Sequence, residues 1–90
     1  INVGRGAIVN EQDLADAIDN HVIAAAGLDV LTEEPMNPNS PFLHIQDSKK
    51  LLITPHIAWA TAEARQRLLA TAIENVKAFV EGTPQNTIRF

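Results

Sequence analysis

The pattern of apolar and polar positions predicts short buried strands that alternate with amphipathic helices. Four consecutive apolar or β-branched residues, Leu51–Thr54, are typical of a short buried strand. Pro55 ends this strand, because proline supplies no N–H for a sheet ladder. A second strand is predicted within residues 22–30, where small residues are flanked by apolar ones, and we expect helices on both of its faces. Residues 1–3 are predicted to be the end of a third strand.

Two helices are predicted between and after these strands. Asn10 is a favourable N-cap for a short helix that ends near residue 20, and Glu11 stands in its first turn, where a carboxylate favours the helix dipole. A longer helix is predicted to follow Thr61, with apolar residues at spacings of three and four, and to stop at Gly82. A strand–helix–strand order with so short a helix is typical of a right-handed βαβ unit. The predicted fold class is therefore α/β with a parallel sheet.

The residues with candidate chemistry lie at the ends of the predicted strands. His56 comes just after the Leu51–Thr54 strand, where open α/β sheets bind their ligands. Its imidazole changes protonation state near neutral pH, so it can give or take a proton. A loop histidine with a purely structural role is the alternative. Arg5, Asp29 and Glu34, each at the end of another apparent strand, favour the chemical interpretation.

Two acidic residues follow the predicted central strand. A buried carboxylate needs hydrogen-bond donors, so Asp29 either caps a neighbouring loop or accepts a hydrogen bond from a ligand, and both alternatives stay open. Glu34 lies in the loop of residues 31–40, which closely spaced prolines stiffen. Adjacent acids usually form a solvated face. A rigid loop that leaves the same sheet edge as His56 can, however, hold one of them against the imidazole.

The turn Gly4–Gly6 matches the dinucleotide-binding fingerprint G-x-G-x-x-G only in part. Val9 stands at the third glycine position, and no helix is expected directly after Gly6, so a phosphate cradle is not predicted here. The two glycines are instead expected to free the backbone around Arg5, so that its guanidinium projects from a strand end. A surface arginine that pairs with a carboxylate is the alternative for Arg5.

Composition narrows the classes of function. The chain has 90 residues, a net charge of −4 and 46% hydrophobic residues, which is typical of a globular protein and disfavours nucleic acid or an anionic membrane surface as a partner. The chain has no cysteine, so it forms no disulfide and offers no thiolate metal ligand, which fits a cytoplasmic location. No metal site is expected. No apolar run approaches the roughly 20 residues that cross a bilayer. Because the chain begins with Ile1, we expect a piece of a longer polypeptide.

Three motifs, in this order and spacing, resemble the D-isomer-specific 2-hydroxyacid dehydrogenases. They are Asn2–Gly6, Ala26–Val30 followed by Glu33–Pro35, and Thr54–Ile57. The resemblance covers almost the whole chain and implies a fragment of a Rossmann-type doubly wound parallel sheet that ends in a long helix. Residues 1–60 would be the C-terminal half of the NAD-binding domain, and residues 61–90 a helix and tail that link to the substrate domain or a partner subunit. The run after His56 is most similar to the glycerate dehydrogenase (hydroxypyruvate reductase) branch.

The resemblance also implies roles for individual residues. Arg5 matches the arginine that binds the substrate carboxylate and polarises its ketone, a task that suits a permanently charged, bidentate guanidinium. His56 matches the general acid/base, and Glu34 matches the carboxylate hydrogen-bonded to it. Asp29 matches the residue that holds the nicotinamide end of the cofactor. The implied cofactor-binding residues are Val3, Gly4, Arg5, Asp29, His56 and Ala58.

The implied activity is hydride transfer between NAD(H) and a small 2-oxo or D-2-hydroxy acid, with hydroxypyruvate and D-glycerate as the best-matching pair. A homodimer without nucleic-acid or membrane partners is expected. The phosphate-binding glycines and the residues that choose NAD or NADP are expected upstream of this chain. Where the family commonly has two glycines after the His-Ile step, this chain has Ala58 and Trp59, and the indole can crowd the site or cover the substrate.

Three other classes of function are alternatives to this one. A non-catalytic, NAD-sensing relative similar to the corepressors that share the fold is the main alternative. A free-standing interaction module built on the long helix is disfavoured, because it would leave sheet edges exposed. Hydrolases are disfavoured because the sequence contains neither G-x-S-x-G nor H-E-x-x-H.

Overall fold

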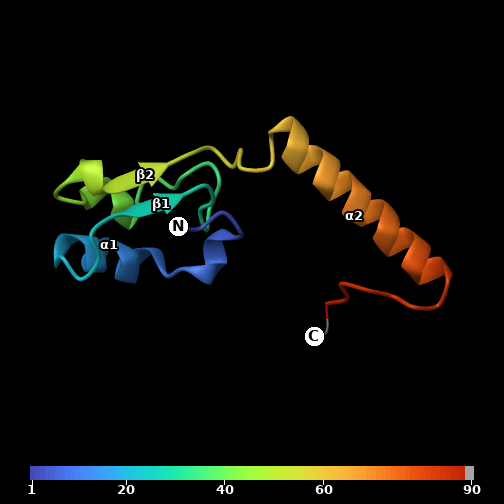
Figure 1. The fold of residues 1–90 in the computed structure, drawn as a ribbon. Coiled ribbons are helices and arrows are strands. Elements are labelled where there is room, and N and C mark those ends of the chain that lie inside the picture. The colour runs from blue at the N-terminus through green and yellow to red at the C-terminus, as the bar shows by residue number, and fades with distance from the viewer. Residues whose placement is uncertain (89–90) are drawn as a thin grey trace. The chain divides into compact units, whose positions relative to one another are not determined.

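The computed structural model describes residues 1–88 and divides into two compact units, Ile1–Ile57 and a second that begins at Ala58. Two parallel strands and one α-helix form the first unit, and a single α-helix dominates the second (Figure 1). The α/β fold class is therefore confirmed. The α-helices and strands are α1 (Glu11–Asp19), β1 (Ala26–Leu28), β2 (Leu51–Ile53) and α2 (Ala62–Val80), and short 3₁₀ turns occupy Gly6–Ile8, Pro41–His44 and Ser48–Lys50.

The sheet places β1 in the centre, as predicted. β1 and β2 pair in parallel with Gly27 opposite Leu52, and both arrows run in the same direction in Figure 1. The N-terminal segment joins the other edge of β1, where Asn2 forms a parallel bridge with Leu28. In that bridge the Asn2 N–H donates to the Gly27 carbonyl, and the Asp29 N–H donates to the Asn2 carbonyl, both at 2.9 Å. The carboxyl ends of three neighbouring segments consequently meet at one edge of the sheet.

The core of the first unit lies on one face of the sheet, between the strands and α1. It is centred on the buried side chains of Ala15 from α1, Leu28 from β1 and Phe42. Asn10 caps α1 as predicted, since its side chain accepts hydrogen bonds from the N–H groups of the second and third helical residues. Successive strand residues point to opposite faces, and Leu52 on the other face is 67% exposed. Residues 1–57 contain one α-helix, α1, so within them the prediction of helices on both faces of the strand at residues 22–30 is wrong.

The glycine turn after the first strand segment serves close packing rather than backbone freedom. Neither Gly4 nor Gly6 has a positive φ, so the predicted conformational role of these two glycines is wrong. Gly6 is buried, and a Cβ at this position would lie 2.0 Å from the carbonyl carbon of Leu31. The turn continues into the 3₁₀ turn Gly6–Ile8 instead of an extended run. Only glycine leaves room for the backbone that crosses it here.

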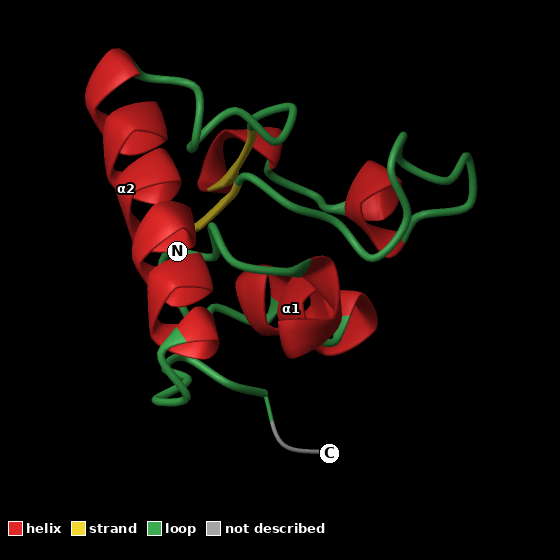
Figure 2. Ribbon diagram, turned by 90° about the vertical axis from the view of Figure 1, so that its right-hand side faces the viewer, coloured by secondary structure: helices red, strands yellow, loops and turns green. Residues whose placement is uncertain are grey.

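The second unit consists mainly of α2, which Figure 2 shows as one uninterrupted helix. Thr61 caps it as predicted, because its hydroxyl oxygen accepts a hydrogen bond from the Ala64 N–H at 3.1 Å. Gly82, with a φ of 75°, follows its C-terminus in the left-handed conformation that ends many helices. The large apolar side chains of the helix are exposed in this chain; they are Leu68, Leu69, Ile73, Val76, Phe79 and Val80. Over residues 1–88, neither α-helix combines the length and the hydropathy of a membrane span.

Candidate active site

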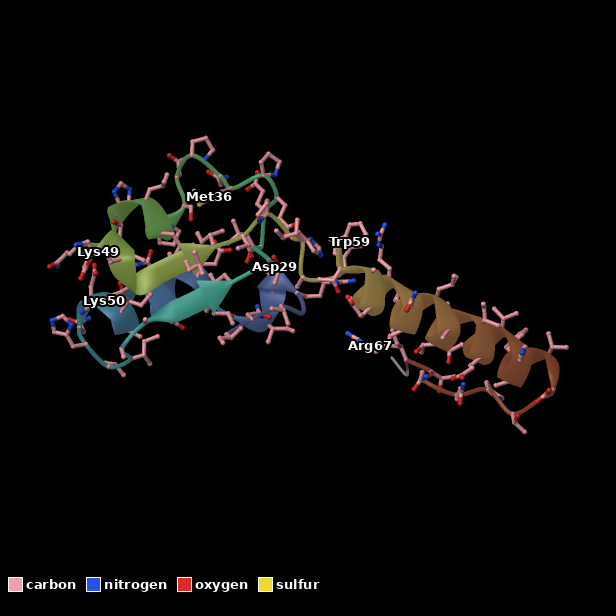
Figure 3. All side chains as sticks on the ribbon, turned by 45° about the horizontal axis from the view of Figure 1, so that its top comes forward. Asp29, Met36, Lys49, Lys50, Trp59 and Arg67 are labelled. Carbon is pink, nitrogen blue, oxygen red and sulfur yellow. The ribbon has the colours of Figure 1, made fainter. Side chains whose placement is uncertain are left out.

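A pocket of about 360 Å³ lies at the carboxyl ends of β1 and β2. Figure 3 shows Asp29 at this end of β1, with Lys49 and Lys50 at the opposite end of the sheet. Apolar side chains make up most of the wall, and a few polar groups from different segments converge on it. The lining residues are Asp29, Leu31, Glu34, Pro35, Met36, Ile53, Thr54, Pro55 and His56. Parallel α/β sheets bind ligands at this position, where loops leave the ends of neighbouring strands.

The pocket brings Glu34 and His56 together. Oε2 of Glu34 lies 2.7 Å from Nδ1 of His56, and the two side chains are 38% and 41% exposed. The other carboxylate oxygen accepts a hydrogen bond from the Leu31 N–H at 2.9 Å. The hydrogen bond from His56, together with that from the Leu31 N–H, lowers the pKa of Glu34 below its ordinary value. The contact that the resemblance implied for these two residues is therefore present.

The protonation state of the pair follows from the chemistry of a carboxylate. A glutamate is ordinarily ionised at neutral pH, and the lowered pKa of Glu34 favours that form further; an ionised carboxylate only accepts hydrogen bonds. The proton between the two residues is then carried by Nδ1 of His56. The contact therefore fixes the orientation of the ring and the tautomer in which Nδ1 donates to Glu34.

Asp29 holds the loop that carries His56. Its side chain is buried, with 4% exposure, and Oδ1 accepts hydrogen bonds from the Thr54 hydroxyl at 2.5 Å and from the Ile57 N–H at 2.9 Å. These donors lie on either side of His56 in the chain. Of the two alternatives left open by the sequence, loop capping is observed, and the cofactor contact stays a prediction.

The backbone of His56 is in the left-handed region, with a φ of 56°. That conformation is uncommon for a residue other than glycine and costs about 1–2 kcal/mol. The Asp29 hydrogen bonds and the bond from the His56 N–H to the Thr54 carbonyl, at 3.0 Å, fix the turn around it. The histidine is thus held in a defined position by contacts that involve its neighbours in the chain.

Arg5 lies on the N-terminal segment and does not line this pocket. Its backbone is extended, its side chain is exposed, and Nη1 donates a hydrogen bond to the Gly4 carbonyl at 2.8 Å. Val3 and Gly4 are exposed beside it. The convergence of Arg5 with His56 stays a prediction, and so does the role of Ala58, which begins the second unit.

Two residues that the sequence left without a role form hydrogen bonds to segments that carry the site residues. Thr54 donates to Asp29, and Glu11 of α1 accepts a hydrogen bond from the Thr32 N–H at 2.7 Å, across 21 positions of the chain. A hydroxyl residue two positions before the histidine was a usable signal for Thr54. Nothing local distinguished Glu11 from other acids in a first helical turn.

The described residues contain no cluster of three or more histidine, aspartate or glutamate side chains placed to hold a metal ion.

Comparison with known proteins shows the family. The family model described as "D-isomer specific 2-hydroxyacid dehydrogenase, NAD binding domain" matches residues 1–58. A hydroxypyruvate reductase from Blautia hydrogenotrophica is 43% identical over 88 residues, which cover 98% of this chain and 26% of that protein. A glycerate dehydrogenase from Methylorubrum extorquens is 42% identical over 88 residues, with 98% and 28% covered. The chain thus spans about a quarter of the length of these relatives.

Solved structures agree with this assignment. An acyclic imino acid reductase in complex with NADPH and D-Arg superposes with a TM-score of 0.66 and 30% identity, over 98% of this chain and 27% of that one. An NADPH-dependent glyoxylate/hydroxypyruvate reductase from Sinorhizobium meliloti, in complex with NADP and malonate, gives a TM-score of 0.61 and 32% identity, over 99% and 30%. This chain belongs to the D-isomer specific 2-hydroxyacid dehydrogenase family and matches its NAD-binding domain.

Proposed function

We propose that the whole protein transfers hydride between a nicotinamide dinucleotide and a small 2-oxo acid or its D-2-hydroxy acid. Hydroxypyruvate and D-glycerate are the proposed pair, in agreement with the names of the hydroxypyruvate reductase and the glycerate dehydrogenase that match 98% of this chain. The observation that carries the proposal is the Glu34–His56 pair, with its 2.7 Å contact, in a pocket at the carboxyl ends of parallel strands. An imidazole held by a carboxylate at such a place is equipped for proton transfer.

His56 is proposed to act as the general acid and base. In reduction, Nε2 gives its proton to the ketone oxygen as hydride arrives at the carbon, so that the oxo acid becomes a hydroxy acid and the ring becomes neutral. In oxidation, Nε2 takes the hydroxyl proton back. Glu34 fixes the orientation of the ring through Nδ1. Asp29 and Thr54 keep the histidine loop in place throughout.

The proposed cofactor is NAD, which the family description names, and it supplies or accepts the hydride when bound. The pocket fits the nicotinamide end of the molecule, because Leu31 and Ile53 offer apolar walls for a ring while Asp29 and Thr54 offer polar groups. The turn at Gly6 does not fit a pyrophosphate, since protein backbone already fills the space that its missing side chain leaves. The solved relatives described above contain NADPH or NADP, so both cofactors belong in the assay.

Arg5 is proposed to bind the carboxylate of the oxo acid in the whole protein. Its guanidinium is exposed and permanently charged, and its backbone segment is hydrogen-bonded to β1 beside the pocket-lining strand end. Val3, Gly4 and Ala58 are proposed to contact the cofactor. The exposed apolar residues of α2 support a further element that covers this helix, which we propose is the substrate domain or the second subunit of a homodimer.

The test is an assay of NADH and NADPH oxidation by the whole protein with hydroxypyruvate, glyoxylate and pyruvate. We expect turnover with at least one of these acids, and a His56→Gln variant that loses roughly 10²- to 10⁴-fold in turnover while it binds NADH as before. Turnover by His56→Gln at the normal rate would remove His56 from the proton-transfer role. Tight NADH binding without turnover of any oxo acid would instead support a non-catalytic, NAD-sensing protein.

A further inference from the structure

The position of the Glu34 carboxylate depends on the backbone immediately before it. Its Oε1 accepts the Leu31 N–H at 2.9 Å, while Oε2 contacts His56 at 2.7 Å. A single carboxylate group therefore joins the backbone at the start of its own loop to the histidine ring. A shift of the Leu31 peptide would move the donor that holds Oε1, and with it the carboxylate that contacts His56.

The backbone at residues 31–32 is in turn fixed from the side of α1. The Thr32 N–H donates to Oε1 of Glu11 at 2.7 Å, a charge-assisted hydrogen bond that spans 21 residues of sequence. Gly6 packs against the same backbone so closely that a Cβ would lie 2.0 Å from the carbonyl carbon and the oxygen of Leu31. The loop is thus confined by a steric stop at Gly6 and by a polar tether at Glu11.

The helix that carries Glu11, α1, is itself held in place by its N-cap and by buried side chains. Asn10 caps α1 through two N–H groups, at 3.0 and 3.2 Å, and Ala15 and Ile18 bury its apolar face. Glu11 is the first residue of this helix and is half-buried, so its carboxylate starts from a fixed backbone. A contact from such an element can set where a loop lies.

We propose that Glu11 is a positioning residue for the Glu34–His56 pair, and that it acts by holding the Thr32 N–H and hence the loop that aims the Glu34 carboxylate. The proposal rests on the proposed function of His56 as the proton donor. Glu11 contacts neither His56 nor the pocket that contains it, so its influence on turnover passes through the loop. The property of Glu11 that matters is an acceptor oxygen on a side chain long enough to meet the Thr32 N–H.

Substitutions at position 11 separate the length of the side chain from its charge. Glu11→Gln keeps the length and an acceptor oxygen but loses the charge, whereas Glu11→Asp keeps the charge and shortens the side chain by one methylene. We expect Glu11→Asp and Glu11→Ala to lower kcat of the whole protein roughly 10- to 100-fold, with the KM for the cofactor unchanged, and Glu11→Gln to stay within about threefold of the unaltered protein. Asp13→Ala is the matched control, because it removes an acid from the same helical turn without touching Thr32.

A double-mutant cycle with Glu34→Gln tests whether Glu11 acts through Glu34. We expect Glu11→Asp to cause almost no further loss of kcat in the Glu34→Gln background, because the group that it positions is already altered. Losses that multiply, a Glu11→Asp variant as active as Asp13→Ala, or a Glu11→Gln variant as impaired as Glu11→Asp would overturn the proposal. If Glu11→Ala does not fold, the Asp and Gln variants still decide the matter.

A readout that needs no turnover separates this inference from the proposed function. The ¹⁵N chemical shifts of the His56 ring in the whole protein report which nitrogen carries the proton. We expect Glu11→Asp to reduce the population with the proton on Nδ1, and Glu11→Gln to preserve it. Absence of oxo-acid reduction by the unaltered protein would reject the proposed function alone. An unchanged ring spectrum in Glu11→Asp would reject the positioning role alone.

Discussion

Asp29 accepts a hydrogen bond from the backbone N–H of Ile57, the residue that follows His56, at 2.9 Å. The same carboxylate oxygen also accepts the Thr54 hydroxyl, two residues before the histidine. A buried carboxylate with 4% exposure thus bridges the two ends of the turn that holds His56 at a φ of 56°. Asp29 defines the geometry of this turn through the protein's own groups, whatever it contacts in a bound cofactor.

Thr54→Val is expected to destabilise the protein, because it removes a hydrogen-bond donor from a buried carboxylate while it keeps the shape of the side chain. The loss should be about 1–3 kcal/mol in the free energy of unfolding, measured by urea denaturation. Thr54→Ser retains the hydroxyl, so its free energy of unfolding should be close to that of the unaltered protein. Thr71→Val, at an exposed position of α2, is the control, and equal stability of the two valine variants would contradict the role of the Thr54 hydroxyl.

Gly6→Ala is expected to be among the most damaging small substitutions in the first unit. The added methyl group would lie 2.0 Å from the carbonyl carbon of Leu31, so backbone has to move, at a cost of at least about 1–3 kcal/mol. Gly27→Ala in β1 is the matched control, because its Cβ would meet only the end of the Ile1 side chain, at 3.9 Å. Thermal unfolding of both variants checks this, and a Gly6→Ala variant as stable as Gly27→Ala would show that the loop yields easily.

Features that depend on neighbours in sequence were predictable from the sequence. Asn10 and Thr61 cap the helices as predicted, because an N-cap side chain bonds to N–H groups two or three residues later. The strand predicted over Leu51–Thr54 is β2, Leu51–Ile53, one residue shorter, and it stops before Pro55 because proline cannot continue a ladder. These local rules also placed His56 at the carboxyl end of a strand, which is why the candidate site was found.

Features that depend on distant segments were not predictable in this way. The packing role of Gly6 is set by backbone some 25 residues later, and the Glu11 contact spans 21 residues. A glycine that leaves room and a glycine that permits a positive φ look alike in sequence, so the local pattern does not distinguish these two roles for Gly6. Helices were predicted on both faces of β1, and within residues 1–57 this is wrong. An apolar strand sequence indicates that the strand is buried but does not say which segment covers it.

Arg5→Lys in the whole protein is expected to raise the KM for the oxo acid and to lower kcat by roughly tenfold or more. Lysine keeps the positive charge but loses the planar pair of donors that grips a carboxylate and polarises the adjacent ketone. Steady-state kinetics at saturating NADH measure both constants. Lys49→Arg, at the opposite end of the sheet from the pocket, is the control for an exchange between the two basic side chains (Figure 3). Unchanged constants in Arg5→Lys would assign Arg5 a structural role only.

Glu34→Gln is expected to change the pH dependence of stability in a defined direction. The pKa of Glu34 is lowered by the hydrogen bond from His56 and by that from the Leu31 N–H, so the folded state favours the ionised carboxylate. A group with a lowered pKa contributes stability that is complete above the ordinary glutamate pKa and is lost as the pH falls through the lowered one. The stability advantage of the unaltered protein over Glu34→Gln should therefore be present at neutral pH and shrink as the solution becomes acidic.

The measurement is the free energy of unfolding of both proteins by urea titration from neutral pH down to about pH 3. Glu74→Gln, which removes an exposed glutamate on α2, is the control for the loss of one negative charge. A Glu34→Gln difference that stays constant across this range, or that grows in acid, would mean that the carboxylate gains nothing from His56 and Leu31 in the folded state. In that case the short contact would fix the orientation of the His56 ring without favouring the ionised form of Glu34.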